Sequence, residues 1–309
     1  MTHILITGGA GNVGSALASK LAEDNSNYIV IIDNLSTGSL HKIPQKENVK
    51  FIKANCNVYN DIVPIFGRYD FNYVFHYAAV VGVKRTLANP ISVLEDIEGI
   101  KNILSLSKNS GVERVFFSSS SEVYGEPFEI PQNEKTTPLN SRLPYAIVKN
   151  VGEAFFKSYQ QEYGLNYTIF RFFNTYGPNQ SEDFVITRFV KAALKNEPIY
   201  IYGDGMQTRS FCYVDDNITT CVKILNEGLC MNDVINIGSH KEQTILSLAE
   251  EIIKHTQSLS KIVFLPALPE GDMARRCPDN SKMLSILNKD LITLEEGIAK
   301  LTAFYKKPN

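Results

Sequence analysis

The sequence lacks a long apolar run, a marked net charge and an ordered set of cysteines. No uncharged apolar run reaches about 18 residues, so we expect no membrane-spanning helix and no membrane partner. The formal net charge is −2 over 309 residues, which gives no electrostatic reason to expect nucleic acid as a partner. The five cysteines have no metal-ligand or redox spacing, so we expect reduced thiols and no bound metal; they are Cys56, Cys212, Cys221, Cys230 and Cys277.

Signals for export, repeats and free linkers are also missing. Met1 leads directly into an apolar segment and leaves no room for a signal peptide, so we expect a cytoplasmic protein. A hydrophobic content of 44% and a charged content of 21% are typical of an ordinary globular chain, and 309 residues can bury a large core. No linker, repeat or low-complexity tract divides the sequence.

Short apolar segments alternate with helical patterns through the first half. This alternation predicts a doubly wound parallel sheet of the Rossmann type, with helices on both faces. The predicted strands are 3–7, 28–32, 49–53, 72–76, 113–118 and 166–171, and the predicted helices are 13–23, 89–109 and 145–163.

The C-terminal part is richer in proline and predicts a smaller α/β lobe docked on the sheet. Its helical stretches are 184–195, 215–227, 244–256 and 295–305. We expect a Rossmann domain over 1–170 and the lobe over 171–309, with an approximate boundary that the chain can cross. Ligands of doubly wound sheets lie beyond the carboxyl ends of the strands.

The N-terminus carries the pattern of a dinucleotide site. Gly8, Gly11 and Gly14 follow an apolar strand and open a helix, which allows a tight turn and a close approach of the backbone to a pyrophosphate. The helix N-terminus offers free N–H groups to the phosphate charge. Asp33 ends the second strand, where an acidic residue binds the adenosine ribose hydroxyls.

A second group of residues predicts acid–base chemistry. Tyr145 and Lys149 are four residues apart and share one face of a helix. An ammonium and an oxidised, cationic nicotinamide would favour the phenolate, which could take a proton from a hydroxyl as hydride leaves its carbon. Serines 118–121 end the fifth predicted strand and place further hydroxyls at the same edge of the sheet.

Together these residues resemble the extended short-chain dehydrogenases/reductases. Within that family the chain resembles the nucleotide-sugar epimerase/dehydratase group, UDP-glucose 4-epimerases included, over nearly its whole length. The resemblance rests on the glycine pattern, Asp33, Tyr145 with Lys149, and three further segments: His76–Ala79 (HYAA), Arg171–Pro178 (RFFNTYGP) and Tyr202–Phe211 (YGDGMQTRSF).

The resemblance implies NAD as cofactor and a role for each matching position. Ser120 would bond the reacting hydroxyl, Tyr145 would be the acid–base group and Lys149 would hold the nicotinamide ribose. Asp33 would select NAD over NADP. Further cofactor contacts would come from Gly8, Gly11, Asn12, Val13, Gly14, Asn34, Asn55, Cys56, Ala78, Ala79 and Phe172. Asn174 and Arg209 would hold the substrate diphosphate, Ser121 would contact the substrate, and Arg275 or Arg276 would assist.

Three positions differ from the family pattern. Asn55 stands where the family often has Asp near the adenine, and Asp96 stands where many members have Asn. Pro269 and Glu270 stand where an arginine is often found, and Arg275 with Arg276 follows shortly as a replacement.

The segment Ser121–Gly125 (SEVYG) leaves the fate of the oxidised sugar open. The favoured hypothesis is a 4-epimerase. A Ser-Glu pair here also resembles UDP-glucuronate decarboxylases and GDP-mannose 4,6-dehydratases. In the dehydratases the glutamate, here Glu122, would remove the proton next to the new ketone. A 4-dehydrogenase that releases the ketone is a further alternative.

The resemblance also implies an oligomeric state, and one alternative to an enzyme remains. In relatives, helices that match 89–109 and 145–163 form a four-helix dimer interface, so the resemblance implies a homodimer. A dinucleotide-sensing binding module is the alternative from another class. Such modules typically lose the Tyr or Lys or carry a basic face, and this chain does neither.

Overall fold

The computed structural model describes residues 1–267 and 275–306 and has a seven-stranded parallel sheet at its centre. The strand order is β11-β6-β5-β4-β1-β2-β3, and every neighbouring pair is parallel. The strands are β1 (Thr2–Thr7), β2 (Asn27–Asp33), β3 (Val49–Lys53), β4 (Tyr73–His76), β5 (Arg114–Ser120), β6 (Asn166–Phe172) and β11 (Asp233–Ile237). The predicted Rossmann-type sheet is confirmed.

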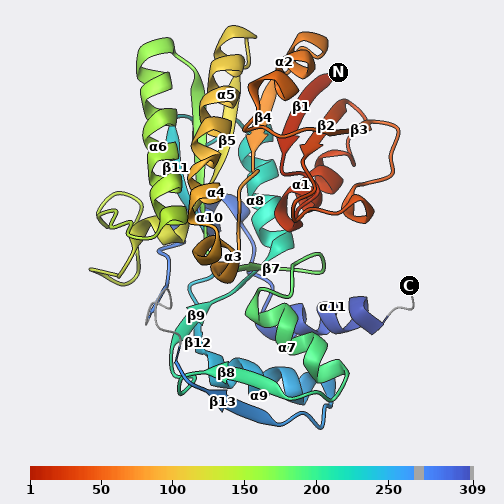
Figure 1. The fold of residues 1–309 in the computed structure, drawn as a ribbon, viewed down its shortest axis with the longest axis vertical. Coiled ribbons are helices and arrows are strands. Elements are labelled where there is room, and N and C mark those ends of the chain that lie inside the picture. Colours follow the sequence, from red (N-terminus) through yellow and green to blue (C-terminus); the bar gives the residue numbers. More distant parts are fainter. Residues whose placement is uncertain (268–274, 307–309) are drawn as a thin grey trace.

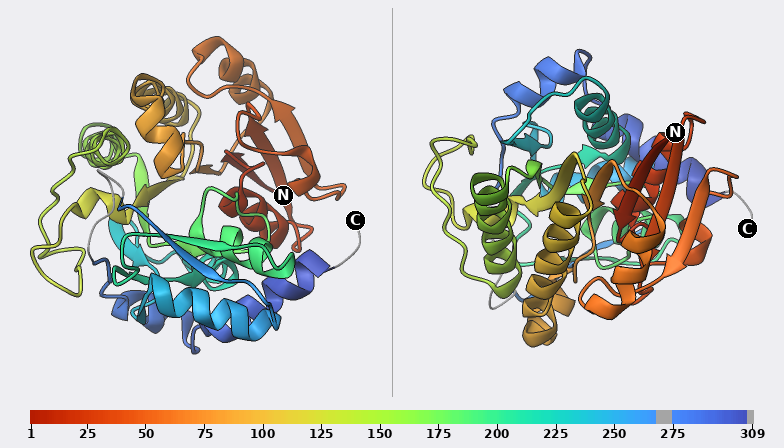
Figure 2. Two further views of the ribbon diagram at one scale, coloured as in Figure 1. Left: turned by 60° about the horizontal axis from the view of Figure 1, so that its bottom comes forward. Right: turned by 90° about the horizontal axis from the view of Figure 1, so that it is seen from above.

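Helices cover both faces of this sheet (Figures 1 and 2). One face carries α2 (Tyr59–Arg68), α5 (Asp96–Asn109) and α6 (Pro144–Tyr163). The other carries α1 (Asn12–Leu21), α8 (Val214–Asn226) and α10 (Ser281–Leu287). Two short helices, α3 (Val83–Ala88) and α4 (Pro90–Leu94), precede α5, and the 3₁₀ turns η1 (Leu40–Lys42) and η2 (Ser121–Tyr124) follow β2 and β5.

The apolar sequence of the strands explains the three layers. Successive side chains of a strand point to opposite faces. In β1, Ile4 and Ile6 therefore pack toward α1 and α8, whereas Leu5 packs toward α2 and α5. All three are fully buried, as a sheet covered on both faces requires.

The second part of the chain is shared between the sheet and a smaller lobe. The lobe lies below the sheet in Figure 1 and contains α7 (Val185–Leu194), α9 (Ile245–Thr256) and α11 (Leu294–Lys306). Its short strand pairs are β7 (Thr175–Tyr176) with β10 (Cys212–Tyr213), β9 (Thr208–Ser210) with β12 (Glu242–Thr244), and β8 (Ile199–Tyr202) with β13 (Ile262–Leu265). Between these elements the chain returns to the sheet to form α8 and β11. A division at residue 170 stays a prediction.

Several elements differ from the sequence expectation. The single helix predicted over 89–109 is wrong, because it is divided into α4 and α5 around Glu95. Helix α2 was not predicted, since Pro64 lies inside it and removes a backbone donor. Strand β11 was also missed, since Asn236 interrupts its apolar run. In the described residues, no helix is long and apolar enough to cross a membrane.

Candidate active site

A cavity of about 570 Å³ opens at the carboxyl ends of the sheet strands. The loops after β1 to β6 line it, together with residues of the small lobe and the 276 segment. Eighteen of the residues predicted from the sequence lie on its wall: Gly8, Gly11, Asn12, Val13, Gly14, Asp33, Asn34, Asn55, Cys56, Ala78, Ala79, Ser120, Ser121, Glu122, Tyr145, Phe172, Asn174 and Arg276. Lys149 and Arg209 are buried but are not among the lining residues.

The glycine loop has space for backbone only. Gly8 has a φ of +68°, and a Cβ there would lie 2.7 Å from the Cα of Ala78. A Cβ on Gly14 would lie 2.4 Å from the carbonyl oxygen of Gly8. Gly11 is the N-cap residue of α1 and has no side chain that could accept a hydrogen bond. The first N–H groups of this helix therefore receive no side-chain acceptor from the cap. This arrangement fits the pyrophosphate of a dinucleotide.

Asp33 lies at the end of β2 with its carboxylate fixed by backbone donors. Its Oδ2 accepts from the N–H of Ala10 at 3.0 Å, and its Oδ1 accepts from the N–H of Leu35 at 2.8 Å. A carboxylate that accepts two N–H bonds has a fixed direction and further lone pairs for a ligand. Asn34, Asn55 and Cys56 continue the wall on this side. Burial raises the pKa of the Cys56 thiol to about 12, so it stays protonated.

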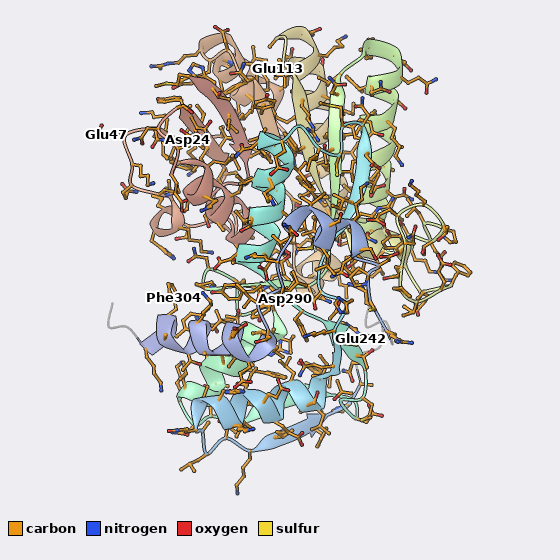
Figure 3. All side chains as sticks on the ribbon, turned by 180° about the vertical axis from the view of Figure 1, so that it is seen from behind. Asp24, Glu47, Glu113, Glu242, Asp290 and Phe304 are labelled. Atoms are coloured by element: carbon orange, nitrogen blue, oxygen red, sulfur yellow. The ribbon has the colours of Figure 1, made fainter. Side chains whose placement is uncertain are left out.

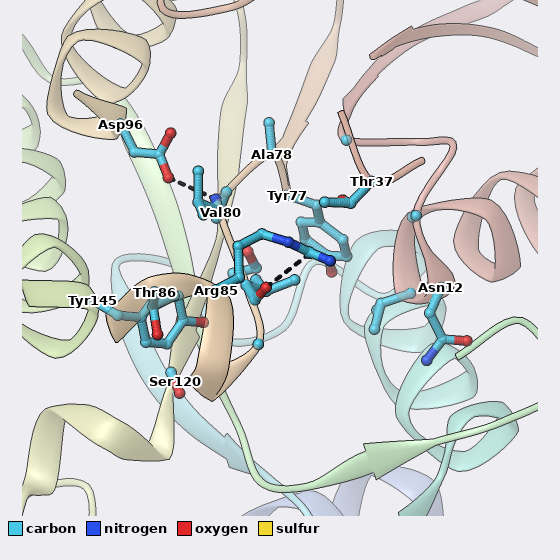
Figure 4. Close-up of a pocket in the computed structure, with 18 of the residues that line it drawn as sticks. Asn12, Thr37, Tyr77, Ala78, Val80, Arg85, Thr86, Asp96, Ser120 and Tyr145 are labelled. Carbon is cyan, nitrogen blue, oxygen red and sulfur yellow. Dashed lines mark hydrogen bonds between the residues drawn. The ribbon is translucent and has the colours of Figure 1, made fainter. Parts of the chain in front are cut away.

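Tyr145 and Lys149 lie on the first turns of α6, next to the end of β5. Proline at the first position starts this helix, and the spacing of four residues stacks the two side chains. The Lys149 Nζ lies 5.7 Å from the centre of the Tyr145 ring and 4.9 Å from the centre of the Phe117 ring. Ser120 ends β5 and faces Tyr145 (Figure 4).

Burial opposes the charged form of both groups. It lowers the pKa of Lys149 to about 8, although the Asp96 carboxylate acts in the other direction. Burial, followed by the charge of Glu122, holds the pKa of Tyr145 well above its usual value, while a hydrogen bond with Ser120 lowers it. The phenol is therefore a proton donor in this state, and it needs added positive charge to become a base.

Glu122 and Arg276 form an ion pair in the cavity wall. The Arg276 Nη1 donates to the Glu122 Oε1 at 2.9 Å, and the two side chains are 7% and 18% exposed. Arg275 takes a different direction. It pairs with Glu242 on β12 of the small lobe, where Figure 3 labels Glu242, and it is not among the lining residues. Of the two arginines proposed to assist, only Arg276 reaches the cavity. Pro269 and Glu270 lie outside the described residues.

Asn174 lines the small-lobe side of the cavity, whereas Arg209 is buried and does not line it. Asn174 has a φ of +24°, and its Nδ2 donates to the carbonyl of Ser210 at 2.9 Å. Arg209 lies on β9 with 8% exposure, and its Nη1 donates to the carbonyl of Thr208 at 2.7 Å. A substrate diphosphate at Arg209 would therefore need its guanidinium to turn toward the cavity.

Several lining residues were not predicted as site residues. The segment after β4 contributes Val80, Arg85 and Thr86, and α5 contributes Asp96 (Figure 4). Arg85 Nη2 pairs with Asp183 of the small lobe at 2.9 Å. The position of this segment, directly after a strand end, was the available signal. Within the described ranges, no three His, Cys, Asp or Glu side chains group as metal ligands do.

The family model for NAD dependent epimerases/dehydratases matches residues 4–238. The chain belongs to this family. It is therefore an enzyme with NAD as cofactor, which fits the glycine cradle and the Asp33 carboxylate described above. Membership of this enzyme family speaks against the alternative of a non-catalytic dinucleotide-sensing module.

Individual relatives extend over the whole chain. A putative UDP-glucose 4-epimerase of Methanocaldococcus jannaschii is 35% identical, over 99% of each chain. The UDP-glucuronic acid decarboxylase 1 of Danio rerio is 34% identical, over 99% of this chain and 73% of the relative. The crystal structure of the Thermotoga maritima UDP-glucose 4-epimerase with UDP-glucose superposes with a TM-score of 0.92 at 30% identity, over 99% of both chains.

Proposed function

We propose that this enzyme oxidises the C4 hydroxyl of a nucleotide-linked sugar and reduces the ketone from the opposite face, which gives the 4-epimer. The observation that carries the proposal is the meeting of Ser120 and Tyr145 on the wall of the cavity that starts at the glycine loop. The similarity to proteins named as UDP-glucose 4-epimerases supports it.

Ser120, Tyr145 and Lys149 divide the proton chemistry. The glycine loop and Asp33 would hold NAD, which would supply the hydride acceptor for C4. Ser120 holds the reacting hydroxyl, and Tyr145 takes its proton. The Lys149 ammonium stands 5.7 Å from the centre of the ring, and together with the cationic nicotinamide that NAD would supply it would favour the phenolate against the burial that keeps Tyr145 protonated. Tyr145 then returns the proton when the ketone is reduced.

Cofactor and diphosphate are held at the two ends of the cavity. We propose that Asp33 binds the adenosine ribose hydroxyls and repels the 2′-phosphate of NADP. On the small-lobe side, the amide of Asn174 and the guanidinium of Arg209 would bind the substrate diphosphate. A guanidinium suits this role because it can bond two phosphate oxygens at once.

Decarboxylation of a uronic acid is the second candidate. The observation that favours it is Arg276, whose guanidinium stands in the cavity wall against Glu122. A sugar carboxylate would find a cation there, and several relatives are named as UDP-glucuronic acid decarboxylases. Both candidates begin with oxidation at C4.

Product mass separates these candidates. The purified enzyme is incubated with a panel of UDP- and GDP-linked hexoses and hexuronic acids, while nicotinamide absorbance and product mass are followed. Epimerisation leaves the mass unchanged, release of the ketone removes two hydrogens, and the other routes remove CO₂ or water. Absence of any sugar conversion across the panel would contradict the proposal.

We also propose a cytoplasmic homodimer that pairs through α4, α5 and α6. The support is a set of exposed apolar side chains on α4 and α6: Ile91, Leu94, Ile147 and Tyr163. Helices that pack in a four-helix interface would cover them. Analytical ultracentrifugation should show a dimer for the parent and a monomer for a variant with charges at Ile91 and Ile147.

A further inference from the structure

A buried carboxylate stands in the cavity wall with neutral hydrogen-bond donors. Asp96 is the first residue of α5, is 9% exposed and lines the cavity. Its Oδ2 accepts from the N–H of Val80 at 2.7 Å, as Figure 4 shows, and its Oδ1 accepts from the Asn57 Nδ2 at 3.1 Å. Among the side chains that the structure describes, none with a positive charge forms an ion pair with it within 4.0 Å.

Neutral donors fix the direction of this carboxylate but do not balance its charge, and a buried charge is stabilised by an opposite charge near it. The group that supplies part of that charge is Lys149, which is 3% exposed on α6. The Asp96 carboxylate is the largest influence that raises the pKa of Lys149 against burial. The two residues therefore act on one another through their charges, without an ion pair within 4.0 Å.

The groups around Asp96 come from three elements. Tyr145 and Lys149 face it from α6, and Asn57 faces it from the loop after β3. Cys56 belongs to the same loop and stays a neutral thiol, since its pKa is raised to about 12. Val80 faces Asp96 from the loop after β4. Apart from Lys149, none of these neighbours carries a positive charge that would balance Asp96, which lines the cavity.

We propose that Asp96 is an electrostatic positioning residue whose charge balances the cations of the cofactor pocket, the Lys149 ammonium and the nicotinamide ring of oxidised NAD. The nicotinamide is a cation in NAD and neutral in NADH, while the rest of the two molecules is the same. A buried carboxylate therefore favours the oxidised form, and it does so more strongly than it would in water. The pocket would then prefer the cofactor form that C4 oxidation requires.

Competition between the two cofactor forms tests this directly. The enzyme is equilibrated with an equimolar mixture of NAD and NADH near pH 6, where Lys149, with a pKa of about 8, is charged. The bound cofactors are released by denaturation and quantified by chromatography. We expect Asp96→Asn to lower the bound ratio of NAD to NADH about tenfold, as a unit charge in a partly buried site would.

Glu98→Gln is the matched control. Glu98 lies in the same first turn of α5 and loses the same charge, but it is exposed and its carboxylate pairs with Lys101. We expect its ratio to stay within about twofold of the parent, because exposed charges are screened. An unchanged ratio in Asp96→Asn, or an equal shift in Glu98→Gln, would overturn the proposal.

A second variant keeps the test decisive if Asp96→Asn does not fold. Asp96→Glu retains the charge with a longer side chain. A parental ratio in this variant supports the proposal, and a lowered ratio contradicts it. The measurement uses only the family's cofactor, so its outcome is independent of whether the proposed sugar chemistry is correct.

Discussion

Glu153 and Arg171 form a two-point ion pair inside the protein, behind the serine-rich end of β5. The Arg171 Nε donates to the Glu153 Oε1 at 2.9 Å and its Nη2 donates to Oε2 at 2.7 Å, with both side chains at most 3% exposed. Ser119 donates to the same carboxylate, and Arg171 also donates to the hydroxyl of Tyr124 at 2.8 Å. The pair thus ties α6, which carries the acid–base residues, to β5 and β6.

Breaking this pair should destabilise the fold strongly. Glu153→Gln keeps the shape but leaves the Arg171 guanidinium charged and buried, and such losses cost about 3–5 kcal/mol. Urea unfolding of parent and variant measures the difference. Glu182→Gln is the control, because its partner Lys191 is on the surface and the expected loss is below about 1 kcal/mol. A loss of similar size in both variants would contradict the buried pair's importance.

Asp33→Ala should weaken NAD binding and relax the choice of cofactor. Loss of a charged acceptor for the ribose should cost roughly 1.5–3 kcal/mol of NAD affinity and leave NADP affinity unchanged or higher. Calorimetric titration with each cofactor checks this. Asp24→Ala removes a carboxylate that also accepts a backbone N–H, from Ser26 at 2.8 Å, but lies in the turn before β2 and should bind NAD as the parent does. A parent that prefers NADP would show the assignment to be wrong.

Tyr145→Phe should remove the acid–base group and leave the fold intact. Loss of general acid–base catalysis should lower turnover about 10²–10⁴-fold. Sugar conversion under saturating substrate measures the effect, and NAD binding verifies the fold. Tyr163→Phe removes a hydroxyl from the exposed end of the same helix and should retain parental turnover. Near-parental hydride transfer in Tyr145→Phe would take this residue out of the mechanism.

His76 should make the fold sensitive to mild acid. Burial, with the charge of Lys149, lowers its pKa to about 3, and its Nδ1 lies 2.9 Å from the hydroxyl of Thr7. Between about pH 6.5 and pH 3 the unfolded state therefore binds a proton that the folded state does not, so stability falls as the pH falls. From pH 7 to pH 5 the parent should lose about 2 kcal/mol through this residue.

A pair of histidine variants isolates this contribution. His76→Asn keeps a polar atom near Thr7 and removes the titrating imidazole. Between pH 7 and pH 5 the unfolding free energy of this variant should therefore fall by about 2 kcal/mol less than that of the parent. His41→Asn alters an exposed histidine and should follow the parent. Identical pH dependence in all three proteins would show that His76 is not held neutral.

The sequence predicts the parts of the fold that follow from hydrophobic periodicity and from local turn-forming residues. The glycine loop, Asp33 and the i, i+4 pair of α6 are local patterns, and the cavity brings the first two together with Tyr145. Most strand bounds agree within two residues, because apolar runs covered on both faces leave little freedom.

Long-range contacts could not be obtained in this way. Nothing local in β11 shows that it pairs with β6, since that contact depends on the return of the chain through α8. The ion pair of Glu122 with Arg276 joins residues 154 positions apart. The direction of Arg275, away from the cavity and onto Glu242, depends on the small lobe as a whole.

Glu122 is the residue that separates the chemistries after C4 oxidation. An epimerase needs no second base, because hydride and proton transfer at C4 are complete with Tyr145. A 4,6-dehydratase needs one, since the C5 proton must leave before water can. Glu122→Gln keeps the size of the side chain and can still accept from Arg276 through its amide oxygen, so it removes mainly the basicity.

We therefore expect Glu122→Gln to oxidise C4 at a rate within about tenfold of the parent, which corresponds to at most about 1.4 kcal/mol of barrier. The rate is followed through nicotinamide absorbance with the substrate found in the sugar panel, and the parent's product made in deuterated water should carry no deuterium at C5. Arg276→Lys serves as the partner variant. It keeps a cation but loses the planar guanidinium, which could bond both oxygens of a sugar carboxylate, so a uronic acid substrate should lose affinity while a neutral hexose should not. Deuterium at C5, loss of water from the product and a large rate loss in Glu122→Gln would together replace epimerisation by elimination. Deuterium at C5 with loss of CO₂ would instead indicate decarboxylation, because the carbanion left at C5 also takes up a solvent proton.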